Sequence, residues 1–224
     1  MKKTIAIAVP NTGYIGFRTV ASLLSFKVPG GYQLNFNLLS NCLVYEAREK
    51  LVEYAQQIGA SHILFLDSDM VPPQHTIESM IKHDKDIISG LIFQRNYPFQ
   101  PCFYSKARVN KNFEPTMEGP MQPEGWPTEG AYEFEGIGLA CALIKMEVFE
   151  KTPKPWFFPL PNVGEDLAFC MRARKAGFKI WVDFGVDCAH TADMQIVKRS
   201  FELASKEWLS RPENKGKMIF GGNK

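Results

Sequence analysis

Two carboxylates, Asp67 and Asp69, stand on either side of Ser68, directly after the largely apolar run at residues 62–66. A short run of this kind is typical of a buried strand, so the two carboxylates are expected where a strand ends. In an extended chain, residues two apart point to the same side. Carboxylate oxygens are preferred ligands of Mg²⁺ and Mn²⁺, so the pattern predicts a divalent-metal site that could bridge phosphate oxygens. A polar turn whose Asp caps the next helix is the alternative.

A second acidic pair, Glu165 and Asp166, follows Gly164 at the start of a helix predicted over residues 165–176. Carboxylates are favoured at this end of a helix by its dipole, so simple capping would account for the pair. The functional interpretation is a general base, which would accept the proton of an attacking hydroxyl group.

A histidine late in the chain, His190, follows the sequence Asp187-Cys188-Ala189. A neutral imidazole is a common ligand of borderline metals, which makes His190 a candidate metal ligand. A purely structural role is the alternative. The other histidines, at positions 62, 75 and 83, are expected at strand edges and on the surface.

The segments that must position these residues alternate between strand and helix in the first half of the chain. Apolar runs predict strands over residues 4–9, 32–37, 62–66 and 86–90, with helices over 16–25, 40–59 and 73–83. Ser40 is the expected cap of the second helix. Its predicted buried face consists of Leu43, Ala47, Leu51, Ala55 and Ile58. This order predicts an α/β fold with a largely parallel sheet, in which ligands bind at the carboxyl ends of the strands.

The second half is less regular. We expect strands over residues 98–105, 132–135, 139–145 and 178–182, and a final amphipathic helix over 193–209. Residues 113–130 are rich in Pro, Glu and Gly and include Trp126, which predicts a long loop, either a lid or a disordered segment. We expect a single domain over 1–224, with a nucleotide-sugar-binding half at 1–95, an acceptor and catalytic half at 96–192, and a C-terminal helix and tail at 193–224.

The composition limits the classes of partner. The chain has 224 residues, a formal net charge of +2 and 45% hydrophobic residues, as expected of a globular protein. No dense Lys/Arg run indicates a nucleic-acid partner, and no stretch approaches the length of a membrane span. The five cysteines are widely spaced and form no C-x-x-C pair, which predicts reduced thiols and a cytoplasmic location. The oligomeric state stays open.

The order of these patterns resembles the GT-A glycosyltransferases, most closely family 2-like members. The resemblance covers roughly residues 4–192 and rests on Ala8-Val9-Pro10-Asn11, on Ala47-Arg48, on the Asp-x-Asp motif at 67–69, on the segment 136–144 and on the Glu-Asp helix at 164–178. It implies a Rossmann-like nucleotide-diphospho-sugar transferase fold with a mixed, mainly parallel sheet flanked by helices.

The resemblance also implies roles for single residues. Pro10, Asn11, Arg48, Asp67 and Ser68 would line the nucleotide pocket. The metal, Mn²⁺ or Mg²⁺, would be held by Asp67, Asp69 and His190. Asp166 matches the catalytic base of inverting members, with Glu165 beside it. The implied partners are a nucleotide-sugar donor and a glycan, protein or lipid-linked acceptor. A UDP-sugar is the expected donor because members of this family often use one.

The chain departs from the family pattern in three places, of which one is Ala-Arg-Glu at residues 47–49, where many members have Ala-Arg-Asn. The acidic residue that reads the base is missing after the second strand, where Asn35 or Asn37 could replace it, and no Gln-x-x-Arg-Trp segment follows the Glu-Asp helix. Because that segment marks processive synthases, single sugar additions are expected. Trp156, Phe157 and Phe158 could stack on acceptor sugars or pack in the core.

Three other classes compete with an inverting transferase. A haloacid-dehalogenase-like phosphatase also carries Asp-x-Asp after an apolar strand, with the first Asp as nucleophile. A sugar- or nucleotide-binding GT-A module without catalysis is the second alternative, and a nucleotidyltransferase, which would release pyrophosphate, is the third. If Asp166 only binds substrate, a retaining mechanism is also open.

Overall fold

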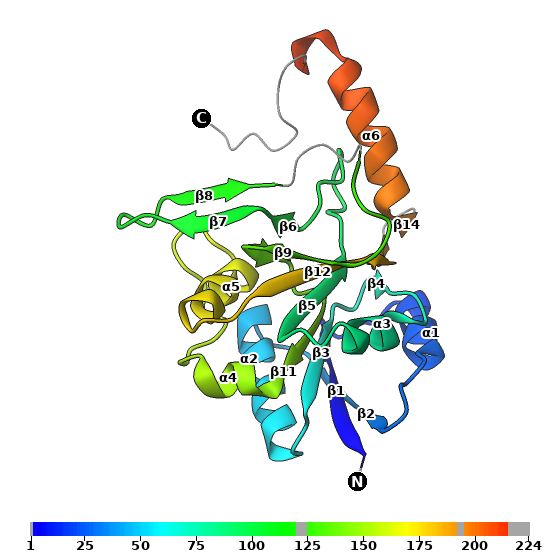
Figure 1. The fold of residues 1–224 in the computed structure, drawn as a ribbon, viewed down its shortest axis with the longest axis vertical. Helices are drawn as coiled ribbons and strands as arrows, with labels where there is room; N and C mark the ends of the chain where they lie inside the picture. Colours follow the sequence, from blue (N-terminus) through cyan, green and yellow to red (C-terminus); the bar gives the residue numbers. More distant parts are fainter. Residues whose placement is uncertain (1, 120–124, 192–194, 215–224) are drawn as a thin grey trace.

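The structure is a computed structural model that describes residues 2–119, 125–191 and 195–214. Its centre is a seven-stranded sheet in the order β2-β1-β3-β11-β5-β12-β9 (Figure 1). The strands are β1 (Lys3–Pro10), β2 (Tyr32–Leu39), β3 (His62–Leu66), β5 (Ile87–Leu91), β9 (Ala131–Phe134), β11 (Cys141–Lys145) and β12 (Ile180–Asp187). Only β11 and β9 run against their neighbours in this sheet. The expected mixed, mainly parallel α/β architecture is confirmed.

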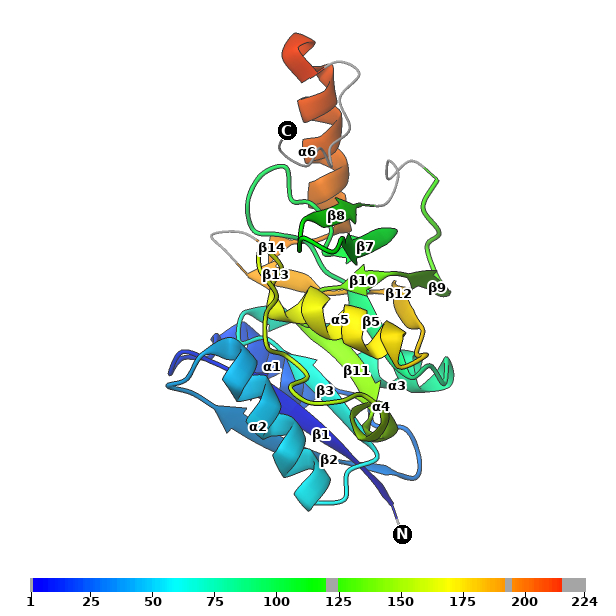
Figure 2. The ribbon, with the colours of Figure 1, turned by 90° about the vertical axis from the view of Figure 1, so that its left-hand side faces the viewer.

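Helices cover both faces of the sheet (Figures 1 and 2). One face carries α1 (Phe17–Ser25) and α3 (Thr76–Lys82), and the other carries α2 (Val44–Gln57), α4 (Met146–Lys151) and α5 (Glu165–Lys175). Strand β3 contributes alternate side chains to the two cores, Ile63 and Phe65 to one and Leu64 and Leu66 to the other. Because both of its faces are buried, β3 is apolar at every position from Ile63 to Leu66 rather than at alternate positions.

The strand β11 interleaves the two halves of the chain. It lies between β3 and β5 and is antiparallel to both. A strand from residues 96–192 therefore completes the centre of the sheet that residues 1–95 begin. This insertion brings the segment before β11 next to the carboxyl end of β3, since the Asp67 N–H donates to the Ala140 carbonyl at 3.0 Å.

A small second sheet joins distant segments beside that end. It consists of β4 (Met70–Val71), β13 (Ala189–Thr191) and β14 (Gln195–Ile196), with β13 in the middle. The chain then enters α6 (Lys198–Ser210) and the 3₁₀ turn η1 (Pro212–Asn214). On α6, the buried Phe201 stacks on Phe93 and Trp126 with ring centroids 5.6 Å apart in both pairs. The final helix was predicted to begin at 193, which was wrong, because residues 195–196 form β14 and the helix begins at Lys198. Residues 193–194 and the tail at 215–224 lie outside the described residues.

The segment 113–130 is not one continuous loop. Strand β8 (Pro115–Glu118) pairs antiparallel with β7 (Lys106–Val109) to form a hairpin, while residues 120–124 lie outside the described part. The strand expected over 98–105 is reduced to β6 (Phe103–Tyr104), which pairs with β10 (Gly136–Ile137). Pro98 and Pro101 have no N–H to donate to a sheet ladder, which accounts for the shortening.

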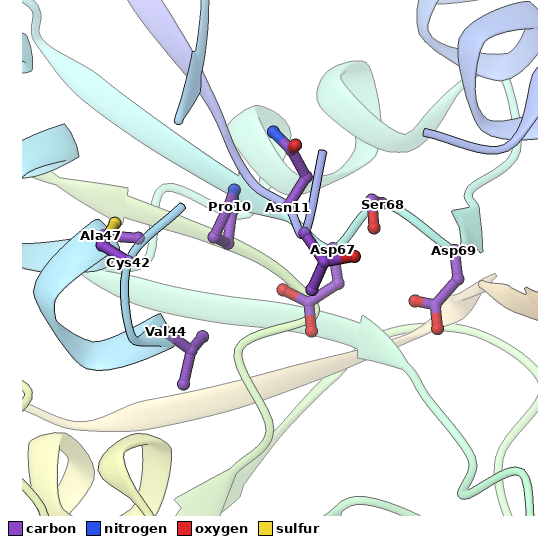
Figure 3. Close-up of a pocket in the computed structure, with 9 residues that line it drawn as sticks. Pro10, Asn11, Cys42, Val44, Ala47, Asp67, Ser68 and Asp69 are labelled. Atoms are coloured by element: carbon purple, nitrogen blue, oxygen red, sulfur yellow. The ribbon is translucent and has the colours of Figure 1, made fainter. Parts of the chain in front are cut away.

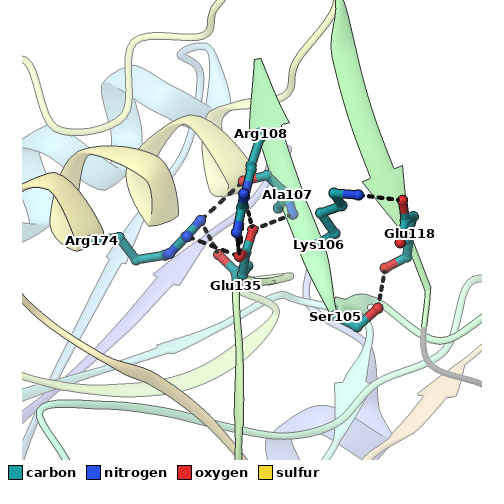
Figure 4. Close-up of polar contacts among 7 residues, drawn as sticks. All are labelled: Ser105, Lys106, Ala107, Arg108, Glu118, Glu135 and Arg174. Atoms are coloured by element: carbon teal, nitrogen blue, oxygen red, sulfur yellow. Dashed lines mark hydrogen bonds and ion pairs between the residues drawn. The ribbon is translucent and has the colours of Figure 1, made fainter. Parts of the chain in front are cut away.

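The β7–β8 hairpin is fastened to α5 through Glu135 (Figure 4). The Glu135 carboxylate accepts hydrogen bonds from Nε of Arg108 at 2.9 Å and from the Ala107 N–H at 3.1 Å. Arg174 of α5 adds an ion pair at 3.2 Å. The hydrogen bonding from Arg108 lowers the pKa of Glu135 to about 2, so the carboxylate stays charged at any ordinary pH. The hairpin is thus linked to the helix that carries Glu165 and Asp166.

Several expected boundaries were wrong for local reasons. Helix α2 begins at Val44 with Leu43 as its N-cap, so Ser40 is not the cap. Asn41 has a φ of +62°, a left-handed conformation that a helix cannot include. Leu43 is 58% exposed and does not belong to the buried face, whereas Ala47, Leu51 and Ala55 do.

The described residues contain neither a membrane-spanning helix nor a disulfide bond. No helix among them combines the length and apolar character needed to cross a membrane. The five cysteines all fall in this part of the chain, and each is a free thiol, as expected.

Candidate functional site

A cleft of about 220 Å³ opens at the carboxyl ends of β1 and β3 (Figure 3). Its walls come from the loops that follow β1 and β2, from the start of α2 and from the acidic turn. The lining residues are Pro10, Asn11, Thr12, Cys42, Val44, Ala47, Asp67, Ser68 and Asp69. Four of the five residues expected around a nucleotide, Pro10, Asn11, Asp67 and Ser68, therefore do share one cleft.

The Asp67-Ser68-Asp69 motif forms a turn. The Met70 N–H donates to the Asp67 carbonyl at 3.1 Å, so the backbone here is a turn and not the extended chain from which the sequence argument started. Both carboxylates nevertheless line the same cleft (Figure 3). The Ser68 carbonyl accepts from the Gly16 N–H and from the Thr19 hydroxyl, both at 3.1 Å. The start of α1 thus holds the turn in place.

Thr191 of β13 holds the other end of the turn. Its N–H and its hydroxyl both donate to the Asp69 carbonyl, at 2.9 and 2.8 Å. This double contact places His190, the neighbouring residue, beside the Asp69 side chain. Sequence reasoning missed Thr191, because nothing local marks a threonine whose partner lies more than 100 positions away.

Asp67 belongs to a buried ionic group centred on Arg48. The Arg48 side chain is 3% exposed, and its Nη2 lies 2.9 Å from Asp67 Oδ1. Its Nε lies 3.6 Å from Glu165 Oε1, and its guanidinium carbon lies 5.1 Å from the centre of the Phe65 ring. The buried Nε and Nη1 atoms have no hydrogen-bond partner in the described structure. Arg48 does not line the cleft directly; it links the acidic turn to the start of α5.

Asp69 belongs to a second group, with His190 and Arg95. Asp69 Oδ2 lies 3.2 Å from His190 Nε2 and 3.2 Å from Arg95 Nη1. Burial would raise the pKa of Asp69, but the hydrogen bond and the charge of His190 outweigh it, so the pKa is lowered. Burial would lower the pKa of His190, but the hydrogen bonds to Asp69 and Phe93 outweigh it, so that pKa is raised.

The tautomer of His190 suits metal binding. Its Nδ1 lies 2.7 Å from the Phe93 carbonyl, which can only accept, so Nδ1 carries a proton. In the neutral ring, Nε2 then carries a lone pair that points toward the Asp69 carboxylate. Nε2 and the carboxylate oxygen are both acceptors, so a proton or a cation must lie between them. The described residues hold no cluster of three or more His, Cys, Asp or Glu side chains suited to a metal. Asp69 and His190 fit an ion that completes its shell with substrate phosphates and water, as Mg²⁺ often does.

Asp67 does not join that pair. Its carboxylate is committed to Arg48 in the structure, so the expected three-ligand set of Asp67, Asp69 and His190 is brought together only in its last two members. The physical reason is the ion pair with the buried Arg48, whereas Asp69 contacts Arg95 and His190.

Asp166 lies at the first turn of α5, half-buried, with its Oδ1 accepting from the Leu167 N–H at 2.7 Å. Burial, together with the charge of Glu165, raises the pKa of Asp166 to about 6. Gly138 lies beside this carboxylate, since a Cβ there would be 3.8 Å from Asp166 Oδ2. A carboxylate with a pKa near neutrality suits proton transfer.

Three asparagines were expected near the nucleotide, and the structure places only Asn11 at the cleft. Asn11 uses its amide to bind the Val9 and Leu39 carbonyls and its Oδ1 to accept from the Gly13 N–H, so it shapes the loop after β1. Neither Asn35 nor Asn37 lines the cleft.

The structure also places four ring side chains that the sequence analysis named. Trp156 and Phe157 are buried in the core, and of this aromatic group only Phe158 is exposed, at 53%. His62 is also buried rather than on the surface, because both faces of β3 are covered.

Arg95 is the site residue that sequence reasoning missed most plainly. It comes four positions after the end of β5, at the edge of the sheet where Asp67 and Asp69 lie. That position was the available signal, since ligands bind at the carboxyl ends of the strands.

No protein-family model matches the chain, and no curated protein does. Solved structures do match. "A197 from STIV" has a TM-score of 0.60 at 18% identity, covering 87% of this chain and 88% of that one. "GalNAc-T7 with UDP, GalNAc and Mn2+" has a TM-score of 0.55 at 12% identity, covering 95% of this chain but 49% of that one. A structure of S. aureus TarS with UDP-GlcNAc has a TM-score of 0.47 at 12% identity, covering 81% and 55%. At these identities the likeness concerns the fold, and the chain has the GT-A fold that its motifs led us to expect.

Proposed function

We propose that the protein is a metal-dependent glycosyltransferase that moves a sugar from a nucleotide-sugar donor, a UDP-sugar, to an acceptor hydroxyl. The observation that carries the proposal is the acidic turn at the carboxyl end of β3, where Asp69 meets His190 beside a cleft of about 220 Å³. The GT-A fold supports it, and so does the presence of UDP and Mn²⁺ in one structural neighbour, GalNAc-T7.

The roles follow from the contacts. Asp69 and His190 would hold a divalent ion, Mn²⁺ or Mg²⁺, which would offset charge on the departing diphosphate. The cleft beside Pro10, Asn11 and Ser68 receives the nucleoside, and Asp67 lies at its wall, oriented by Arg48.

Asp166 is the proposed general base. Its raised pKa allows it to take the proton of an acceptor hydroxyl while that oxygen attacks the anomeric carbon. The hydroxyl oxygen forms the new bond, the bond to the diphosphate breaks, and the configuration inverts. The acceptor is a glycan, a protein or a lipid-linked sugar, and each cycle adds one unit.

The test is release of nucleoside diphosphate from a panel of nucleotide sugars in the presence of Mn²⁺. We expect release from one donor, lost with EDTA and reduced by at least 100-fold in Asp69→Ala, because oriented charge stabilisation at a leaving group is worth roughly 10²–10³. Glu207→Ala, an exposed change on α6, is the matched control.

Two results would contradict the proposal. Binding of a nucleotide sugar without turnover, with every acceptor class supplied, would indicate a GT-A binding module instead. Release of phosphate from simple esters, with no metal-dependent binding of donor, would indicate the phosphatase alternative.

A further inference from the structure

Arg95 contacts the same carboxylate oxygen that the proposed metal site uses. Its Nη1 lies 3.2 Å from Asp69 Oδ2, and that oxygen also lies 3.2 Å from His190 Nε2. Arg95 follows β5 at the carboxyl edge of the sheet, and its side chain is 57% exposed. A water-exposed guanidinium therefore lies where a divalent ion would have to bind.

A guanidinium and a divalent ion compete for Asp69. Two cations on one carboxylate oxygen repel each other, so the Arg95 ion pair is weakened when an ion binds at Asp69 and His190. An exposed ion pair contributes little stability, so it can be broken at small cost. Arg95 is then free to bind another anion within reach.

The contrast with Arg48 supports this difference. Arg48 is 3% exposed and held between Asp67 and Glu165, with Phe65 beside its guanidinium. If the Arg48 side chain moved away, the carboxylates of Asp67 and Glu165 would both lose their cationic partner. Each acidic residue of the turn thus pairs with one arginine, but only the arginine on Asp69 is able to move.

We propose that Arg95 is a phosphate-binding residue: it neutralises Asp69 in the metal-free protein, is released when the divalent ion binds, and then binds the diphosphate of the nucleotide donor. This inference rests on the proposed function. A guanidinium suits the second role because its planar donors can bind two phosphate oxygens at once. The negative charge that the donor brings offsets the loss of the Asp69 contact.

The test measures two equilibria in Arg95→Ala by calorimetry, Mn²⁺ binding to the free protein and UDP binding with Mn²⁺ at saturation. We expect Mn²⁺ to bind roughly two- to five-fold more tightly, because its competitor at Asp69 is gone. We expect UDP to bind roughly ten- to hundred-fold more weakly, because a charged contact to phosphate is lost. Arg95→Lys should bind UDP with intermediate affinity.

Arg199→Ala is the matched control, since this arginine is 71% exposed on α6, pairs with Glu202 and does not line the cleft. It should change neither equilibrium. The opposite signs in Arg95→Ala separate the proposal from general damage, which would weaken both ligands.

Each remaining outcome overturns the inference. Unchanged binding of both ligands, or weaker binding of both, in Arg95→Ala would contradict it while leaving the transferase proposal intact. Failure of the unmodified protein to bind UDP with Mn²⁺ would instead overturn the proposed function, and the inference with it.

Discussion

Asp166 lies in the first turn of α5, where its surroundings oppose its ionisation. Burial and the charge of Glu165 raise its pKa to about 6, and a general base must be ionised to accept a proton. We therefore expect kcat/KM to rise with pH and to level off above about pH 6. The measurement is a pH–rate profile with an identified donor and acceptor.

Two variants at this helix start sharpen the prediction. Asp166→Asn keeps the shape but cannot accept a proton, so the rate should fall by roughly 10²–10⁴. Glu165→Gln removes a charge that raises the pKa of Asp166, so the inflection should move to lower pH. An inflection near pH 4 in the unmodified protein, or one that Glu165→Gln leaves in place, would argue against Asp166 as the base.

At the scale of elements, the close approach of β5 and β12 positions the site. A bulge between Asp183 and Asp187 brings β12 against Gly90, where an added Cβ would lie 2.7 Å from Cys188 Sγ and 2.8 Å from the Val186 carbonyl. Gly90→Ala should lower the free energy of unfolding by about 1–3 kcal/mol, because these strands would have to separate. Urea unfolding measures this.

Gly30→Ala is the control for this change, because a Cβ there would meet no atom within 4 Å. The two strands also lead to Arg95 and His190, so Gly90→Ala should weaken Mn²⁺ binding as well. Equal stability of the two variants would show that β5 and β12 adapt to the extra methyl group without cost.

At the scale of the whole molecule, stability depends on pH through His62. Burial, followed by the charges of Lys145 and Lys3, lowers the pKa of His62 to about 4 in the folded protein, against 6.5 for an unperturbed histidine. The folded state binds fewer protons between these values, so the contribution of His62 is complete above pH 6.5 and is lost as pH falls toward 4. On going from pH 7.5 to pH 5, protonation of His62 in the unfolded state should lower the free energy of unfolding by about 2 kcal/mol.

The measurement is the difference between the unmodified protein and His62→Gln, followed by urea unfolding at both pH values. The difference is needed because Asp166, with its raised pKa, stabilises the fold as pH falls and opposes the trend. The variant should lose less stability than the unmodified protein on going from pH 7.5 to 5. Equal losses in both proteins would contradict the predicted pKa of His62.

The sequence by itself determined the features that depend on local spacing. The continuous apolar run of β3, the acidic turn after it and the Glu-Asp start of α5 were each legible, because burial on two faces and helix dipoles act over a few residues. The alternation of strands and helices was enough to predict a largely parallel α/β sheet, since it allows few arrangements. The GT-A fold itself was expected from the resemblance of the motifs to that family. The sequence also identified Asp69 and His190, each by itself, as candidate metal ligands.

Only the tertiary structure decided which of these residues meet. Asp69 and His190 are 121 positions apart and come together because β13 pairs with β4, two short strands with no periodic signal. The contacts of Arg48 with Glu165 and of Arg95 with Asp69 also join residues that are distant in the sequence. The order of the strands in the sheet and the length of the arginine side chains decide these contacts, and local residue spacing predicts neither. The turn at Ser68 was likewise visible only in the structure, because the hydrogen bond from the Met70 N–H to the Asp67 carbonyl replaces the extended backbone that the sequence argument assumed.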